Sequence, residues 1–341
     1  MARQLRLRLI GIVAALLLVL PAAAGARCDG IDLLQRLPAD ERAAIAAAAD
    51  AVPYPAGNLW RATRGEAVLH IVGTFHIGDA RLAPVLRRLE PLIEAAEVVL
   101  VEVTPDEEQR LLAALAAEPS IAFVTEGPSL IDLLSDEEWA LYTDEMAARG
   151  VPAFMASRFR PWLAFSTLTI PACLFEPGGA LPPGLDDRVI THAVGSGVRV
   201  NGLEGYDVLF RVFDALSFEE SLDLLRATLM QAELSEDLFA TLANAYFAEE
   251  HRLIWEFGRR WMPDDVRALF PPERVEPLYD RLEEVLLARR NRDWLGTILD
   301  EAAHGPVLVA VGAAHLSGHD GLLDLLERAG FTLERLPLAP G

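Results

Sequence analysis

Short uninterrupted runs of apolar residues predict the buried strands of a sheet. They cover residues 67–72, 98–103, 198–203 and 307–311, and residues 331–336 predict a final strand. Strands that are buried on both faces carry such continuous runs, because neither side of the strand faces water. Since these strands come from both ends of the chain, we expect a mixed or mostly parallel sheet that joins the two ends.

Stretches with apolar residues at helical spacing separate these strands. Ser135-x-x-Glu138 and Ser217-x-x-Glu220 are capping boxes, which are typical of helix starts. The proline-rich residues 151–183 predict irregular connecting structure. Residues 207–303 predict almost continuous helix, so we expect an α/β fold with a large helical insertion there. The predicted helices cover residues 39–50, 81–96, 106–117, 135–149, 217–233, 235–257, 272–290 and 292–303.

The N-terminal segment has the pattern of a secretory leader. Three arginines precede the apolar residues 9–20, and small residues around Ala24-x-Ala26 fit a cleavage site. An apolar run of this length is short for a membrane span. We therefore predict a signal peptide over residues 1–26, with an uncleaved anchor as the alternative. Residues 27–341 would then form a single secreted or periplasmic domain.

Charge and cysteine content narrow the function classes. The chain has a net charge of −21 and contains no lysine. The acidic balance argues against a nucleic-acid partner, and the absence of lysine excludes P-loop and Schiff-base chemistry. Association with the cell envelope and the oligomeric state stay open. The two cysteines, Cys28 and Cys173, are either a disulfide in an oxidising compartment or two isolated residues.

An internal echo carries the argument for a site. Residues 68–76 resemble residues 307–315, and each block reads as a buried strand, then Gly-x-x-His, then a helix. The motifs place Gly73 and His76 in one block and Gly312 and His315 in the other. We interpret them as duplicated βα units. Because ligands bind at the carboxyl edge of an open α/β sheet, we expect both histidines to meet there.

Carboxylates follow two further predicted strands. Glu102 closes the run at residues 98–101, and Glu204 follows the run at residues 198–203. Two imidazoles with one or two carboxylates suit a borderline divalent metal such as manganese, cobalt or zinc. Such a metal activates a bound water, and a spare carboxylate serves as general base. The alternative is that these glutamates form structural salt bridges with arginines.

These motifs resemble the TraB/PrgY/GumN family, which includes the Tiki proteins. The resemblance rests on Gly73-Thr74-Phe75-His76, on Gly312-Ala313-Ala314-His315, and on the pairs Val101-Glu102, Leu203-Glu204 and Arg290-Asn291. The stretch Arg158-Phe159-Arg160-Pro161-Trp162 resembles the bacterial GumN-like branch.

The resemblance implies an α/β fold with a metal-dependent site, and the Tiki relatives are regarded as metal-dependent proteases. It assigns His76 and His315 to the metal and Glu102 to the site glutamate. Arg290 and Asn291 match a family pair. We expect Arg290 to bind a substrate carboxylate or an oxyanion, because its planar fork suits bidentate contacts. The alternative for Arg290 is a structural ion pair.

Two functions of different classes follow. The first is a periplasmic metal-dependent hydrolase, a peptidase, acting on a peptide or a small ester or amide. The second is a non-catalytic envelope protein that binds a metal, a tetrapyrrole or a peptide in the same cleft. A hydrolase needs a base beyond its metal ligands, so the extra carboxylate favours the first.

Overall fold

A mixed six-stranded sheet forms the centre of the protein. The computed structural model describes residues 28–176, 179–208, 210 and 215–338. The strand order is β4-β3-β5-β2-β1-β6, and β4, β3, β5 and β2 are parallel to one another. β1 is antiparallel to both β2 and β6. The strands are β1 (Leu59–Arg64), β2 (Ala67–Thr74), β3 (Val98–Val101), β4 (Arg199–Gly202), β5 (Val307–Gly312) and β6 (Thr332–Leu336).

The predicted sheet of strands from both ends of the chain is confirmed. β5, near the C-terminus, lies between β2 and β3 from the first third of the chain. The apolar pattern missed β1, whose sequence is Leu-Trp-Arg-Ala-Thr-Arg. Its two arginines interrupt the strand and leave no continuous apolar run. Parallel pairing places the carboxyl ends of β2, β3, β4 and β5 at one edge of the sheet.

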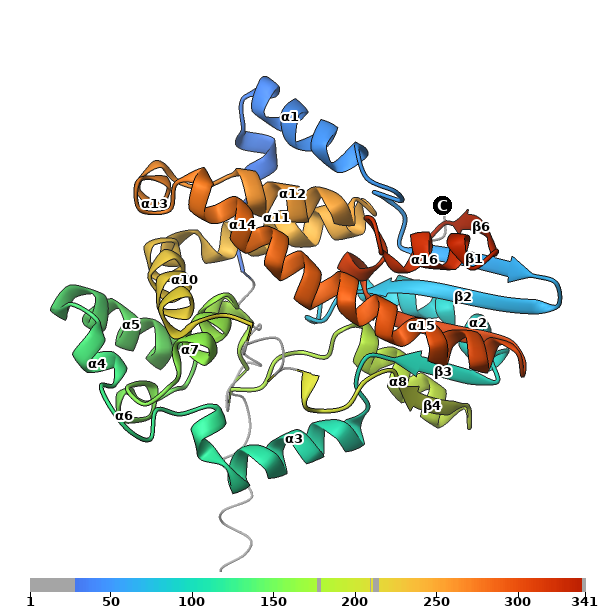
Figure 1. Ribbon diagram of the computed structural model, residues 1–341, viewed down its shortest axis with the longest axis horizontal. Helices are drawn as coiled ribbons and strands as arrows, with labels where there is room; N and C mark the ends of the chain where they lie inside the picture. Colours follow the sequence, from blue (N-terminus) through green and yellow to red (C-terminus); the bar gives the residue numbers. More distant parts are fainter. Residues whose placement is uncertain (1–27, 177–178, 209, 211–214, 339–341) are drawn as a thin grey trace, which may run out of the picture.

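Helices cover both faces of the sheet, as the arrangement in Figure 1 shows. One face packs against α2 (Leu82–Glu94), α8 (Leu185–Gly195) and α11 (Ser235–Phe247). The other face packs against α15 (Arg289–Ala302) and α16 (Leu322–Arg328). Burying both faces explains the continuous apolar runs of the central strands.

A separate helical layer lies beside the sheet and has its own core. It consists of α4 (Leu130–Leu133), α5 (Asp136–Ala148), α6 (Ala153–Ala156), α7 (Pro161–Leu168) and α10 (Phe218–Met230). Both predicted capping boxes are present, at Ser135 and Ser217. The prediction of irregular structure over residues 151–183 is wrong for α6 and α7, since Pro161 occupies the first turn of α7, where a missing N–H does no harm.

The predicted helical insertion is confirmed for the described residues between 207 and 303, with two changes. The helix expected at residues 235–257 is broken: α11 ends at Phe247 and α12 (His251–Arg260) follows Glu249, which has a positive φ of 61°. The helices expected at residues 272–290 and 292–303 are continuous. A π-helical turn, η5 (Glu284–Ala288), joins α14 (Pro272–Glu283) to α15.

The remaining elements are short or peripheral. They are α1 (Ala39–Asp50), α3 (Pro105–Ala117) and α13 (Asp264–Leu269), and the 3-10 turns η1 (Leu33–Arg36), η2 (Pro119–Ile121), η3 (Ala172–Leu174), η4 (Ala232–Leu234) and η6 (Ala313–His315). Among the described residues, no helix is both long and apolar enough to cross a membrane. The predicted signal peptide, residues 1–26, lies outside the described residues.

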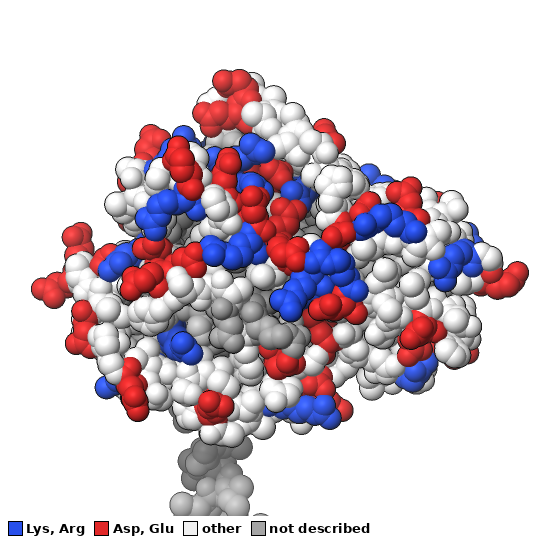
Figure 2. All heavy atoms as spheres, in the orientation of Figure 1, with Lys and Arg blue, Asp and Glu red and all other residues white. Residues whose placement is uncertain are grey.

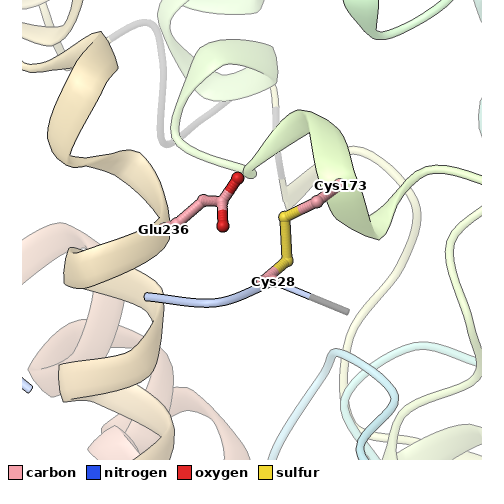
Figure 3. Close-up of side chains that lie close together, drawn as sticks. All are labelled: Cys28, Cys173 and Glu236. Atoms are coloured by element: carbon pink, nitrogen blue, oxygen red, sulfur yellow. A yellow bond between two sulfur atoms is a disulfide. The ribbon is translucent and has the colours of Figure 1, made fainter. Parts of the chain in front are cut away.

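Cys28 and Cys173 form a disulfide, with 5.5 Å between their Cα atoms. The bond joins the first described residue to η3, and Glu236 of α11 lies beside it (Figure 3). The backbone that follows Cys28 runs along α11, where the N–H groups of Asp29 and Ile31 donate to Glu236 and Asp237. The disulfide therefore fixes this segment between two helical layers.

Candidate metal centre

The sheet topology brings the two predicted histidines and one glutamate together. His76 lies just past β2, Glu102 directly follows β3, and His315 lies in η6 after β5. These three strands are neighbours and parallel, so their carboxyl ends meet. Glu102 Oε1 is 4.0 Å from His76 Nε2 and 3.8 Å from His315 Nε2. The two imidazoles thus face one carboxylate oxygen from different strands.

His315 is buried and held in a single orientation. Its Nδ1 lies 2.7 Å from Asn291 Oδ1, and the Asn291 amide donates to the carbonyls of His315 and Asp320. Those two bonds fix the amide, so Nδ1 carries the proton and Nε2 keeps its lone pair. Burial, together with the Arg290 cation, lowers the pKa of His315 to about 3. The ring is therefore neutral at physiological pH, as a metal ligand must be.

His76 has a carboxylate behind its ring. Its Nδ1 is 3.2 Å from Asp186 Oδ1, near the start of α8, which directs Nε2 toward Glu102. Burial alone would lower the pKa of His76, but Asp186 and Glu102 raise it to about 9. The side chain is 58% exposed, so water reaches it. Sequence reasoning missed Asp186, whose only signal was its position in the first turn of a helix.

Glu102 is anchored at both carboxylate oxygens. The Gly312 N–H donates to Oε1 at 2.6 Å, and Arg290 donates to Oε2 at 2.6 Å. Burial alone would raise the pKa of Glu102, but His315, His76 and Arg290 lower it to about 2. Glu102 is therefore ionised, and its negative charge is shared between the imidazole side and the arginine side.

Glu204 sits behind Arg290 and does not face the histidines directly. Both of its oxygens bind Arg290, and the Trp294 indole N–H donates to Oε2 at 3.1 Å. Arg290 also donates to His315 Nε2 at 3.2 Å and to the carbonyl of Leu286 in the π-helical turn. One guanidinium thus contacts two carboxylates and one imidazole, because all five of its donors lie in one planar fork.

Glycine at position 312 keeps space open between the ligand candidates. A Cβ there would lie 2.8 Å from His76 Nε2 and 3.2 Å from Glu102 Oε1. Gly73 has a different role: a Cβ there would lie 2.9 Å from Ala313 Cα and from a methyl group of Leu316. Gly73 allows β2 to approach η6 closely, and Gly312 keeps the site clear. The two glycines are thus required for different steric reasons. The duplication of the two βα units stays a prediction.

The donor chemistry of this cluster fits a borderline divalent ion. Two imidazole Nε2 atoms and a carboxylate oxygen face one another, and each Nδ1 is held by an oxygen acceptor, as in protein zinc sites. The spacing is wider than that of a closed ligand set. Within the described residues, the only three His, Cys, Asp or Glu ligand atoms that all lie within 4.8 Å belong to Cys28, Cys173 and Glu236. The sulfurs of that trio are joined to each other and offer no thiolate (Figure 3).

The model of the TraB/PrgY/gumN family matches residues 58–335, which include all of these site residues. The chain belongs to this family. No curated protein matches the chain. Family membership agrees with the resemblance of the Gly-x-x-His motifs and establishes the family alone, so metal binding and catalysis have to be argued from the site.

A cavity of about 200 Å³ adjoins the site on the far side of Arg290. Glu204, Asp207, Arg289, Arg290 and Trp294 are among the residues that line it. Trp294 contacts both the cavity and the His315 ring, with 4.5 Å between ring centroids. Sequence reasoning missed Trp294, since a tryptophan in an amphipathic helix predicts only a core position.

Proposed function

We propose that this protein is a periplasmic metal-dependent hydrolase that cleaves peptide bonds. One observation carries the proposal: His76 and His315 present Nε2 atoms to the same Glu102 oxygen, at 4.0 and 3.8 Å. Each ring is oriented from behind through Nδ1, by Asp186 and by Asn291. Oriented imidazoles beside a carboxylate are the donor set of catalytic zinc-type centres, and His76, whose pKa is about 9, would release its proton when the ion binds.

The residues of the chain have distinct roles in this proposal. His76, His315 and Glu102 would hold the ion, and a bound divalent ion supplies an activated water and polarises a substrate carbonyl. Glu204 positions Arg290, since it binds the guanidinium through both oxygens. Burial raises the pKa of Glu204, which makes it a stronger proton acceptor than Glu102. Arg290 would give up its hydrogen bond to His315 Nε2 when the ion binds there, and it would then be free to stabilise the oxyanion.

The proposed location rests on the leader pattern and on the disulfide. Residues 1–26 have the sequence of a cleavable signal peptide. Cys28 and Cys173 form a disulfide, and disulfides persist in oxidising compartments such as the bacterial periplasm. We also assign the chain to the GumN-like branch of its family, on the stretch from Arg158 to Trp162. Substrates would be peptides or small esters and amides of the envelope.

The test is the metal content of the mature protein, purified without a chelating resin. We expect about one divalent ion per chain, lost in a His76→Ala/His315→Ala double variant. The matched control is His192→Ala/His304→Ala, which removes two histidines outside the site and leaves the ion bound. Absence of metal from the wild-type protein, even after loading with manganese, cobalt or zinc, would overturn the proposal. Peptide and ester screens with the bound metal then measure hydrolysis.

A second function, a non-catalytic binding protein, is favoured by one specific observation. Arg290 donates hydrogen bonds to Glu102, to Glu204 and to Nε2 of His315. This arrangement compensates the charge of the glutamates, as a binding site requires, and leaves no group free for catalysis. Such a pocket would hold a metal, a tetrapyrrole or a peptide. A peptide-hydrolysis assay of the metal-loaded wild type beside Glu102→Gln separates the two functions. The hydrolase loses turnover and stays folded, whereas a binding protein shows no turnover in either form.

A further inference from the structure

Two adjoining cavities lie mainly among the helices of the insertion, away from the candidate metal centre. Both are lined by Trp261, Met262, Phe270 and Val275, so they meet along these residues. None of the residues that line them belongs to the metal centre. In Figure 1 α10 and α13 lie at the opposite end of the molecule from the sheet, and α11, α12 and α14 run from there toward it.

The first cavity is apolar and large enough for a ligand. It has a volume of about 420 Å³, within the range of about 300–1,000 Å³ found for small-molecule sites. Its walls come from α7 and from α10 to α14, and the apolar lining includes Leu224, Leu238, Ile254, Phe257 and Leu278. Leu242 lines the cavity yet is 36% exposed, and nearby Leu269 is 56% exposed. Apolar side chains therefore lead from the surface into the cavity.

The second cavity is basic, although the protein as a whole is acidic. It has a volume of about 410 Å³, and its charged lining consists of three arginines and two glutamates, namely Arg259, Arg260, Arg267, Glu41 and Glu276. The surrounding surface carries mixed charge, with red and blue side chains interleaved in Figure 2. Arginines outnumber glutamates by one in this lining, although the chain has a net charge of −21, and further carboxylates pair with Arg259 and Arg260 from outside the lining.

The three arginines differ in how far the protein already neutralises them. Arg259 binds Asp280 and lies 3.8 Å from Glu283. Arg260 forms an ion pair with Glu256 through Nε alone, and its side chain is 46% exposed. Arg267 donates to the carbonyl of Met262 and forms no ion pair with any described residue. Arg260 and Arg267 therefore keep donors for an external anion, and arginine binds carboxylates bidentately.

We propose that the two cavities together form a binding site for a long-chain fatty acid. The hydrocarbon chain occupies the apolar cavity, where removal of its CH₂ groups from water stabilises the complex. The carboxylate lies in the adjoining cavity and binds Arg260 and Arg267. Trp261, which stacks on Phe257 with ring centroids 5.0 Å apart, lies at the boundary between chain and head group.

The charges favour this occupant over other apolar ligands. A neutral alkane or alcohol would fill the first cavity and leave the arginines without an anion. A peptide helix would need a long open groove, whereas this site is divided between two compact cavities. An anionic amphiphile with a single chain satisfies both halves.

The test is titration calorimetry of the delipidated, disulfide-bonded protein with palmitate. We expect saturable one-to-one binding, with hexadecanol at least tenfold weaker because it lacks the anion. Arg260→Gln/Arg267→Gln should weaken palmitate binding at least tenfold. The matched control is Arg61→Gln, an exposed arginine of β1 paired with Glu334, which should bind as the wild type does. Ala227→Phe places a ring in the apolar cavity and should abolish binding of both ligands.

Melting temperatures and circular dichroism show whether each variant is folded, and the arginine variants alter exposed side chains. Failure of the wild type to bind palmitate would overturn the proposal. So would equal affinity for hexadecanol, or full palmitate binding by the double arginine variant. Vesicles of phosphatidylglycerol test the other source of an anionic head group. Sedimentation with vesicles in the absence of palmitate binding would show a membrane surface, and would also overturn the proposal.

Discussion

Arg290 Nη2 donates a hydrogen bond to Glu102 Oε2 at 2.6 Å, on the oxygen that does not face the two imidazoles. The same guanidinium binds Glu204, whose side chain is only 6% exposed. Two buried carboxylates thus share one cation. A pKa of about 9 keeps His76 protonated at neutral pH, so in the metal-free protein this imidazolium balances the remaining negative charge of the pair. A divalent ion bound at Glu102 and His76 would replace this proton, which ties metal loading to pH.

Removing this cation should destabilise the metal-free protein strongly. Arg290→Gln leaves two buried carboxylates without their shared partner, and breaking a buried ion pair costs about 3–5 kcal/mol. Arg292→Gln is the control on the same helix: Arg292 pairs at the surface with Glu284 and Asp320, so we expect a loss below about 1 kcal/mol. Urea unfolding in the presence of a chelator measures both. Equal stability of the two variants would contradict the shared-cation arrangement.

Asn291 should matter for metal affinity although it would not bind the ion itself. It fixes the proton of His315 on Nδ1 and holds the loop carbonyls of His315 and Asp320. Loss of such a partner costs about 10–100-fold in metal affinity. We expect this loss in Asn291→Ala, measured by competition with a metal indicator. Asn201→Ala, which removes a contact to Glu301 at the edge of the sheet, is the control and should retain the wild-type affinity.

The candidate site could be predicted from sequence where it depends on strand ends. Residues that follow buried parallel strands meet at one edge, so His76, Glu102 and His315 were placed together by their position in the chain. The same logic placed Glu204 at that edge. It could not show that Glu204 turns toward Arg290 and Trp294, because this depends on how α15 packs across the sheet.

Contacts that come from helices could not be predicted in this way. Asp186 reaches His76 across a sequence separation of 110 residues, and an aspartate in the first turn of a helix is ordinary. The π-helical turn before Arg290 has no local sequence signal, since it adjusts the phase of α15 for packing. The break at Glu249 was missed because apolar spacing continues through it from α11 into α12.

Gly312→Ala should separate folding from metal binding. The backbone of Gly312 is in a conformation open to alanine, with φ of −50°, but the new methyl group would lie 2.8 Å from His76 Nε2. We expect a folded protein with metal occupancy reduced at least tenfold. Gly296→Ala is the matched control, because nothing lies within 4 Å of its added methyl group in α15. It should raise stability by up to about 1 kcal/mol and leave metal binding intact.

The stability of the metal-free protein should fall as the pH drops below the ordinary histidine range. The folded protein holds the pKa of His315 at about 3, while an unfolded histidine has a pKa of about 6.5. Between these values the unfolded chain binds more protons, so acid favours unfolding. From pH 7.5 to pH 5 this contributes a loss of about 2 kcal/mol. His315→Gln cannot titrate and should lose about 2 kcal/mol less over the same range, measured by urea unfolding with a chelator present.

The disulfide should stabilise the folded domain as a whole and not only the N-terminal segment. Cys28 and Cys173 are 145 residues apart, so their bond restricts most of the first half of the unfolded chain. Removing a native disulfide costs about 2–5 kcal/mol, and a long loop lies at the upper end of that range in the chain-entropy account. We expect Cys28→Ser/Cys173→Ser to lose this amount relative to the oxidised protein. The reduced wild type should match the double variant. Alkylation of both thiols without prior reduction would show that the bond does not form, and the double variant would then be as stable as the untreated protein.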